Sequence, residues 1–261
     1  MLHLHFKFAD TRLCDLSPHD IQKRLDRLND TPSEHHHAFA VLRAFLNWAH
    51  QKHYVGEHPM ARMKSPSVGK PRARILTDEE LKAVWKACGD DTHSTIVRLL
   101  ILTGQRKGEI AALTQAMIGA DNITLPAWLT KNSREHIFPL PALTASVVAS
   151  SVARVRSLKK SEPIFGVTVG DSRKRFSAWS KCKARLDVDA AVTGWTLHDL
   201  RRTFASGLAG QGVGLPVIEK ILNHVSGSFA GIVGVYQRYD FQPEMRAALE
   251  KWERHLQTIS A

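Results

Sequence analysis

Apolar residues recur at helical spacing through the first part of the chain. Residues 17–28 begin with Ser and Pro, which suit the first turn of a helix, and then place Ile21, Leu25 and Leu28 on one face. Residues 32–55 repeat the pattern. The apolar face of this second segment consists of Phe39, Leu42, Phe45, Leu46 and Ala49. The pattern therefore predicts two amphipathic helices before residue 56.

The helical pattern resumes beyond residue 74. Residues 77–88 begin with Thr77 followed three positions later by Glu80, the arrangement of a capping box. A long apolar run then stops at Gly104, and a second helix is expected from about Lys107. The capping box predicts a helix over residues 77–88, and residues 92–113 predict two helices that are joined by a turn at Gly104.

One segment has the pattern of strands. In residues 122–140, apolar residues around Ile123 and Leu125 and around Ile137 and Leu140 flank the polar sequence KNSRE. This predicts a strand–turn–strand unit. From residue 143 onward the pattern is again helical, so we expect a mainly α fold with one small antiparallel sheet.

The last predicted helix covers residues 241–256. It carries Met245, Leu249 and Trp252 on one stripe. Such a stripe can pack on its own subunit or dock onto a neighbouring one, and the sequence does not separate these alternatives.

Residues 56–74 interrupt the periodicity. This stretch is rich in Pro, Gly, Lys and Arg, which is typical of a linker. We therefore divide the chain into residues 1–68, a helical domain with the start of the linker, and residues 69–261, a second domain. The basic linker can contact a DNA backbone or be an ordinary solvated segment, and both alternatives stay open.

The net charge indicates the kind of partner that the chain binds. The 261 residues contain 36 Lys and Arg against 25 Asp and Glu, a formal charge of +11. Such a balance in a chain with 43% hydrophobic residues favours a polyanionic partner such as nucleic acid. A generally basic surface is the alternative.

Cysteine and histidine usage argues against disulfides and metal sites. The three cysteines, Cys14, Cys88 and Cys182, are far apart, which suits the reducing cytoplasm. The run His35–His37 cannot converge on one ion, because consecutive helical residues project about 100° apart. No apolar run reaches the about 20 residues of a membrane span. We expect a cytoplasmic protein without metal, cofactor or membrane contact.

Several residues could act on a phosphodiester. His198 and Arg201 lie one turn apart on a predicted helix, and Arg106 follows the Gly104 turn. Two guanidinium groups can grip the non-bridging oxygens of one phosphate with paired hydrogen bonds. Taken singly, an arginine is more often a solvated or surface-paired group.

Five motifs in order resemble the tyrosine recombinases of the phage integrase family, and within it prophage integrases of the P4-like type. The motifs are TGQRKGEI, LTKN, HDLRRTFAS, ILNHVSG and VYQR. The resemblance covers residues 74–250 and implies a mainly α catalytic domain with a small antiparallel β-sheet. Residues 17–68 resemble the later helices of the family's SAM-like core-binding domain. The arm-binding domain and the first part of the core-binding domain are expected to be absent.

The resemblance also implies roles for individual residues. Arg106 and Arg201 would clamp the phosphate, and Lys131 would protonate the leaving 5′-oxygen. His198 would assist proton transfer, and His224 would be a second donor to the phosphate. Glu109 would support the site without reacting.

Two tyrosines compete for the role of nucleophile. Tyr236 lies twelve residues after His224 and belongs to the VYQR segment, so the resemblance favours it. Tyr239, one turn later, is expected to pack or to contact DNA.

The implied activity is site-specific DNA strand exchange through a 3′-phosphotyrosyl intermediate, without metal or cofactor. The implied partners are double-stranded DNA at attachment sites and three further copies of the chain in a homo-tetramer on two DNA sites, with a directionality factor as a further candidate. Two alternatives stay open. One is a truncated relic that only binds DNA, and the other is relaxation of DNA in the manner of type IB topoisomerases.

Overall fold

The computed structural model describes residues 11–68, 72–155, 159–170, 172–224 and 239–261. The chain divides into two compact units, Met1–Ala73 and Arg74–Ala261. Each unit has its own hydrophobic core. The identity of the first unit as a partial core-binding domain stays a prediction.

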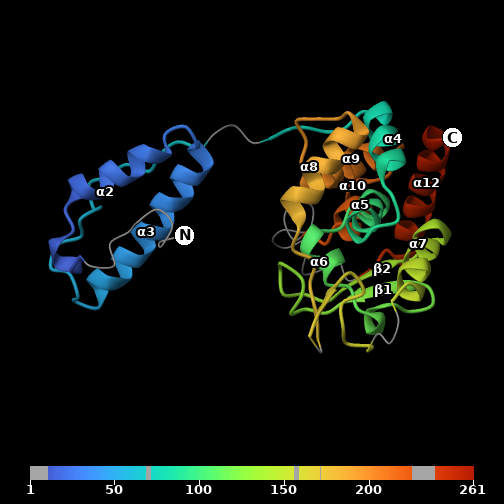
Figure 1. The fold of residues 1–261 in the computed structure, drawn as a ribbon, viewed down its shortest axis with the longest axis horizontal. Helices are drawn as coiled ribbons and strands as arrows, with labels where there is room; N and C mark the ends of the chain where they lie inside the picture. Colours follow the sequence, from blue (N-terminus) through green and yellow to red (C-terminus); the bar gives the residue numbers. More distant parts are fainter. Residues whose placement is uncertain (1–10, 69–71, 156–158, 171, 225–238) are drawn as a thin grey trace. The chain divides into compact units, whose positions relative to one another are not determined.

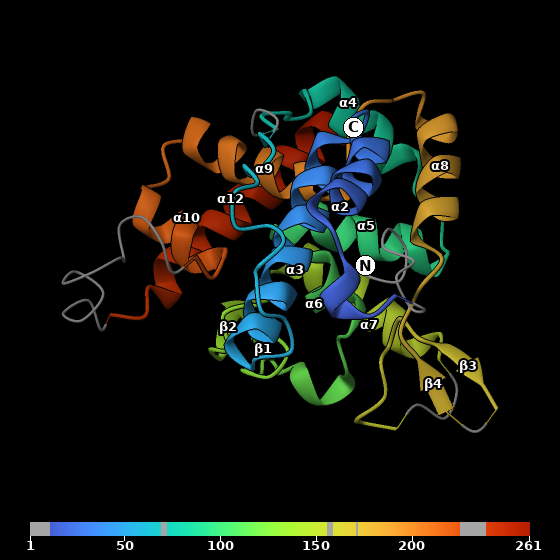
Figure 2. The ribbon, with the colours of Figure 1, turned by 90° about the vertical axis from the view of Figure 1, so that its left-hand side faces the viewer.

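The first unit contains the two helices that the sequence predicts. Its elements are η1 (Leu13–Asp15), α2 (Pro18–Leu25), η2 (Asp26–Leu28) and α3 (Pro32–Gln51). Ser17 caps α2, because its hydroxyl oxygen accepts the backbone N–H of Asp20 at 3.1 Å. Figures 1 and 2 show α2 alongside α3, and Ile21, Leu25 and Leu42 are buried in the small core that joins them.

The second unit is mostly helical. Its first half contains α4 (Asp78–Ala87), α5 (Thr92–Thr103), α6 (Lys107–Ala111), η3 (Gln115–Met117), β1 (Asn122–Leu125), β2 (His136–Pro139) and α7 (Ala142–Ala153). Its second half contains β3 (Val167–Val169), β4 (Ser172–Lys174), α8 (Trp179–Ala190), α9 (Leu197–Gly210), α10 (Leu215–Ile221) and α12 (Gln242–Ser260). The predicted capping box of α4 is present: both Thr77 and Glu80 satisfy backbone N–H groups.

Helix α5 forms the centre of this unit and is drawn end-on in Figure 1. Ten of its twelve residues are buried, so other elements cover it on nearly every side. It ends at Gly104, whose φ of 64° lies in the left-handed region. A Cβ atom at this position would lie 2.4 Å from Cδ1 of Phe204 in α9. The glycine therefore permits both the turn and the close approach of α9.

The predicted strand–turn–strand unit is confirmed. Strands β1 and β2 pair antiparallel, with Asn122 opposite Pro139 and Leu125 opposite His136. The structure adds a second antiparallel pair, β3 with β4, which the sequence did not indicate. Its strands have three residues each, and Val167 and Val169 are about half exposed, so the short Val-Thr-Val alternation of β3 marks no buried face.

Helix α12 packs on its own subunit. Met245, Leu249 and Trp252 are each at most 2% exposed, and the indole N–H of Trp252 donates to the carbonyl of Ile101 at 2.8 Å. For this stripe the structure therefore favours packing in cis over docking on a neighbour. Within the described ranges, none of the helices combines the length and apolar character that a membrane crossing requires.

Candidate active site

Arg201 lies on the buried face of α9 and is only 4% exposed. Its guanidinium donates from Nη1 to the carbonyl of Gly104 at 2.8 Å and from Nη2 to the carbonyl of Leu222 at 2.5 Å. Burial, and then the charge of Arg106, lower the pKa of Arg201, yet a guanidinium remains charged at neutral pH. The fold thus holds a fixed cation between the end of α5 and the end of α10.

Arg106 precedes the first turn of α6 and is anchored by Glu109. Nη1 of Arg106 lies 3.0 Å from Oε1 of Glu109, and the second carboxylate oxygen accepts the backbone N–H of Arg106 at 3.3 Å. The carboxylate is buried, whereas the side chain of Arg106 is 23% exposed. Glu109 therefore orients a guanidinium that still reaches solvent, consistent with its predicted supporting role.

The two arginines and the two predicted histidines form one electropositive group. Arg201 binds the carbonyl of Gly104, two residues before Arg106. Burial, and then the charges of both arginines, lower the pKa of His224 to about 4. Burial and the charges of nearby arginines also lower the pKa of His198. Both imidazoles are therefore neutral at pH 7, and each can still donate one N–H.

The end of α10 places His224. The last carbonyls of a helix have no partner within it, and here other elements supply the donors. Gln105 and His136 both bind the carbonyl of Ile221, at 2.7 and 3.0 Å. Arg201 also donates to the carbonyl of Leu222, so three side chains hold the last turn of α10 in place.

Lys131 is exposed in the loop that connects β1 and β2. Thr130 closes this loop, because its hydroxyl donates to the carbonyl of Arg134 at 2.6 Å and accepts the N–H of Arg134 at 3.1 Å. The neighbour of Lys131, Asn132, forms hydrogen bonds with Asn223, the residue before His224. The structure thus brings the Lys131 loop to the same helix end as His224.

Sequence reasoning missed several residues that build this site. Gln105, Asn132 and Asn223 lie inside the quoted motifs but attracted no role, since their partners are on distant elements. His136 could have been noticed in the sequence as a polar residue within an apolar strand. In the structure it is 6% exposed, and burial lowers its pKa to about 4. A neutral His136 must carry its proton on Nε2 to donate to Ile221.

The two candidate nucleophiles differ in what the structure describes. Tyr236 lies outside the described residues. Tyr239 is 51% exposed, and its hydroxyl donates to Glu244 at 3.0 Å. This hydrogen bond raises the pKa of Tyr239. A phenol held by a carboxylate is harder to ionise, so the environment of Tyr239 is unfavourable for a nucleophile.

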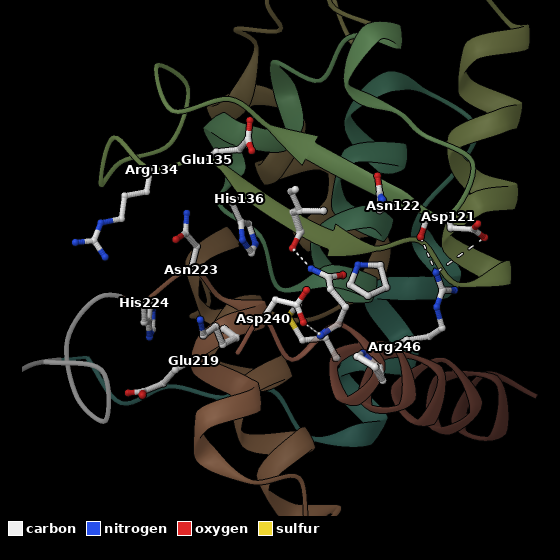
Figure 3. A pocket seen from close by; sticks show the side chains of 16 residues that line it. Asp121, Asn122, Arg134, Glu135, His136, Glu219, Asn223, His224, Asp240 and Arg246 are labelled. Atoms are coloured by element: carbon white, nitrogen blue, oxygen red, sulfur yellow. Dashed lines mark hydrogen bonds and ion pairs between the residues drawn. The ribbon is translucent and has the colours of Figure 1, made fainter. Parts of the chain in front are cut away.

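A cavity of about 870 Å³ lies beside His224. Figure 3 shows Asn223 and His224 at one end of it and Asp121 and Arg246 at the other, with His136 facing in from β2. The lining carries both signs of charge, including Glu219 and Asp240. The mixed charge distinguishes the cavity from the adjoining group of two arginines and two histidines, which it meets at His224.

Metal-ligating side chains do not gather in the described ranges, where no group of three or more His, Cys, Asp or Glu could hold an ion. His35–His37 lie in the first turns of α3. The ring of His36 is within hydrogen-bond distance of the carbonyl of Pro66, at 3.1 Å.

Paired guanidinium groups beside imidazoles are the kind of cluster that can bind a phosphate, and comparison with known proteins gives the family. A sequence model of the phage integrase family matches residues 74–242, so the chain belongs to that family. The predicted family and the predicted fold class are both confirmed.

Two curated relatives illustrate the range of similarity. Tyrosine recombinase XerD of Pseudomonas aeruginosa is 24% identical over 192 residues, which are 70% of this chain and 64% of XerD. Prophage integrase IntZ of Escherichia coli K12 is 30% identical over 188 residues, 70% of this chain and 44% of IntZ. The chain thus matches less than two thirds of either relative.

Solved structures share the fold. A lambda integrase fragment, residues 75–356, bound as a dimer to a core site, superposes with a TM-score of 0.63 at 16% identity, over 83% of this chain and 82% of the fragment. A lambda integrase tetramer bound to a Holliday junction gives 0.64, also at 16% identity, over 82% of this chain and 66% of that one.

Proposed function

We propose that this protein is a site-specific DNA recombinase that exchanges strands through a 3′-phosphotyrosyl intermediate. The oxygen of Tyr236 forms a bond to the scissile phosphorus, and the bond between phosphorus and the 5′-oxygen breaks. The covalent intermediate retains the energy of the broken bond, so a 5′-hydroxyl can reverse the step without ATP.

The observation that supports this proposal best is the fixed pair of guanidinium groups. Arg201 is immobilised by two main-chain carbonyls, and Arg106 is oriented by buried Glu109. Donors that are held in place before the reaction stabilise charge that develops on a phosphoryl group without reorganisation. The two carbonyl bonds use two of the five N–H donors of Arg201, and a phosphate can take others.

Two side chains, His198 and Lys131, would transfer the protons of this reaction. The pKa of His198 lies below its ordinary value, so the neutral imidazole can accept the proton that Tyr236 loses. The ammonium of Lys131 donates its proton to the leaving 5′-oxygen. His198 thus takes up one proton and Lys131 releases one, and no metal ion is needed for the step.

The proposed substrate and assembly follow the relatives. The substrate is double-stranded DNA at two attachment sites, and the active assembly is a homo-tetramer, as in the lambda integrase complex with a Holliday junction. Integration or excision of a mobile element is the proposed outcome. A directionality factor is a further proposed partner, and the net charge of +11 supports DNA as the main one.

A recombination assay tests this function. Purified protein is incubated with two labelled duplexes from the ends of its own element, and recombinant strands are measured on denaturing gels. Recombinant products that depend on both sites are expected. Relaxation of any supercoiled plasmid without site dependence would instead support topoisomerase activity, and binding without strand exchange would support a DNA-binding relic.

A further inference from the structure

We propose that the amide pair Asn132–Asn223 positions Lys131 to protonate the leaving 5′-oxygen. This inference rests on the proposed function, because it assigns a positioning role within the same reaction. Neither asparagine contacts the reacting atoms in the proposed scheme. Each instead adjoins a residue that does: Asn132 follows Lys131, and Asn223 precedes His224.

The geometry of the pair is well defined. Nδ2 of Asn132 donates to the backbone carbonyl of Asn223 at 3.2 Å and to its side-chain oxygen at 2.9 Å. Nδ2 of Asn223 donates back to the side-chain oxygen of Asn132 at 3.3 Å. A backbone carbonyl can only accept, so the orientation of the Asn132 amide is fixed and the Asn223 amide follows from it.

The backbone at Asn223 adds to this specificity. Its φ of 50° lies in the left-handed region, which asparagine tolerates better than most residues with a Cβ atom. This conformation ends α10, and the N–H of His224 donates back to the carbonyl of Glu219 at 2.9 Å. Asn223 thus combines the helix stop before His224 with a side chain that reaches the Lys131 loop.

On the N-terminal side of Lys131, the loop is attached by Leu129, which packs against the core, and by buried Thr130; beyond them it has few other attachments. Within the described part of the chain, the hydrogen bonds from residues 126–135 to another element are those of Asn132. At its base, His136 fastens β2 to Ile221. Lys131, Ser133 and Arg134 are exposed. Removal of the amide pair would therefore release the tip of the loop while its base stays attached.

Loss of this attachment should slow proton donation by Lys131, and a modified substrate can isolate this effect. Proton donation requires Lys131 within hydrogen-bond reach of the 5′-oxygen, and a misplacement of about 1 Å can cost about 100-fold in rate. A substrate with sulfur in place of the bridging 5′-oxygen leaves as a thiolate. Since a thiol has a pKa of about 8.5, this leaving group needs no proton donor.

The test compares single-turnover cleavage of the oxygen and the sulfur substrate. Asn223→Ala also loses the residue that tolerates a φ of 50° before His224, so it is expected to slow both substrates, the oxygen substrate more strongly. Asn132→Ala is expected to cleave the oxygen substrate about 10- to 100-fold more slowly than wild type and the sulfur substrate at nearly the wild-type rate. Lys131→Ala is expected to show the same rescue. Ser133→Ala, in the same loop, is the matched control and is expected to stay within about twofold on both substrates.

A further expectation concerns the double variant. Because the two amides act as one unit, Asn132→Ala/Asn223→Ala should be no slower than the slower single variant. Thermal unfolding of each variant shows that the protein is folded under assay conditions.

The outcomes separate this inference from the proposed function. If sulfur rescues Lys131→Ala but not Asn132→Ala, the positioning role is wrong and the proposed function stands. If sulfur fails to rescue Lys131→Ala, the proton-donor role of Lys131 is wrong and the inference falls with it. If wild type forms no covalent product with either substrate, the proposed function itself fails.

Discussion

Arg201 holds its place through main-chain carbonyls, which makes its chemistry specific to arginine. A lysine at this position has one ammonium group and cannot span the carbonyls of Gly104 and Leu222 with a planar fork. Arg201→Lys is therefore expected to reduce single-turnover cleavage by at least about 100-fold and to lower the melting temperature. Arg202→Lys is the matched control on α9, because Arg202 pairs with Asp199 and lysine can keep such an ion pair. Near wild-type cleavage by Arg201→Lys would contradict the proposed phosphate clamp.

His136 predicts a pH dependence of stability. Burial lowers its pKa to about 4, so the unfolded chain binds a proton more readily than the folded one. The free energy of unfolding should therefore rise with pH through the ordinary histidine range and fall on acidification. Between pH 7 and pH 5 this single group is expected to remove about 2 kcal/mol. Chemical denaturation at both pH values checks this, with His136→Gln as the comparison that should lose this part of the dependence.

At the level of residues, the sequence located the motifs but not the contacts that support them. Arg106, Arg201, His198, His224 and Lys131 lie in motifs that resemble a known family, and their catalytic roles stay predictions. Asn132 and Asn223 lie in the same motifs but received no role from the resemblance, and His136 lies outside them. Asn132 and His136 bind groups at the end of α10, and Asn223 binds the amide of Asn132. The partners are 85 to 91 residues apart in the chain, and hydrophobic patterns do not encode such pairs.

Helix α7 depends on α12 for its first turn. Pro141 precedes α7 and provides no side-chain cap. Glu253 of α12 supplies one: its carboxylate accepts the backbone N–H groups of Leu143 and Thr144 at 3.0 and 2.8 Å. The negative charge also suits the positive end of the helix dipole. The contact therefore joins two elements that are more than a hundred residues apart.

Replacement of Glu253 should destabilise the second unit. Glu253→Ala leaves two buried N–H groups without this acceptor, and a loss of about 1–3 kcal/mol in the free energy of unfolding is expected. Glu250→Ala, one turn earlier on α12, is the control and should cost less. Equal effects of the two substitutions would show that Glu253 contributes no special cap.

At the level of elements, local signals predicted the helices well. The Ser17 cap, the Thr77–Glu80 capping box and the Gly104 stop each mark a helix end within the chain itself, and the structure confirms all three. Strands β3 and β4 were missed because each has three residues, and the Val-Thr-Val alternation of β3 is too short to predict a strand. The cis packing of α12 could not be predicted, because it depends on where Ile101 lies in the folded unit.

The molecule as a whole carries a large positive charge, and its linker is the part that can be tested for DNA contact. Arg62 and Lys64 are exposed. If each contacts a phosphate, Arg62→Ala/Lys64→Ala should lower the slope of log affinity against log salt by about 2. Lys86→Ala, at the end of α4, is the control and should leave the slope unchanged. An unchanged slope in the linker variant would favour an ordinary solvated linker.

The proposed reaction requires a covalent bond between Tyr236 and DNA, and this bond can be trapped. Nicked duplexes from both ends of the element lose the 5′-strand after cleavage, so the covalent product accumulates and is seen on denaturing gels. Peptide mapping then identifies the linked residue. We expect an adduct at Tyr236 that disappears in Tyr236→Phe and persists in Tyr239→Phe. An adduct at Tyr239, or DNA binding without any adduct, would contradict this expectation.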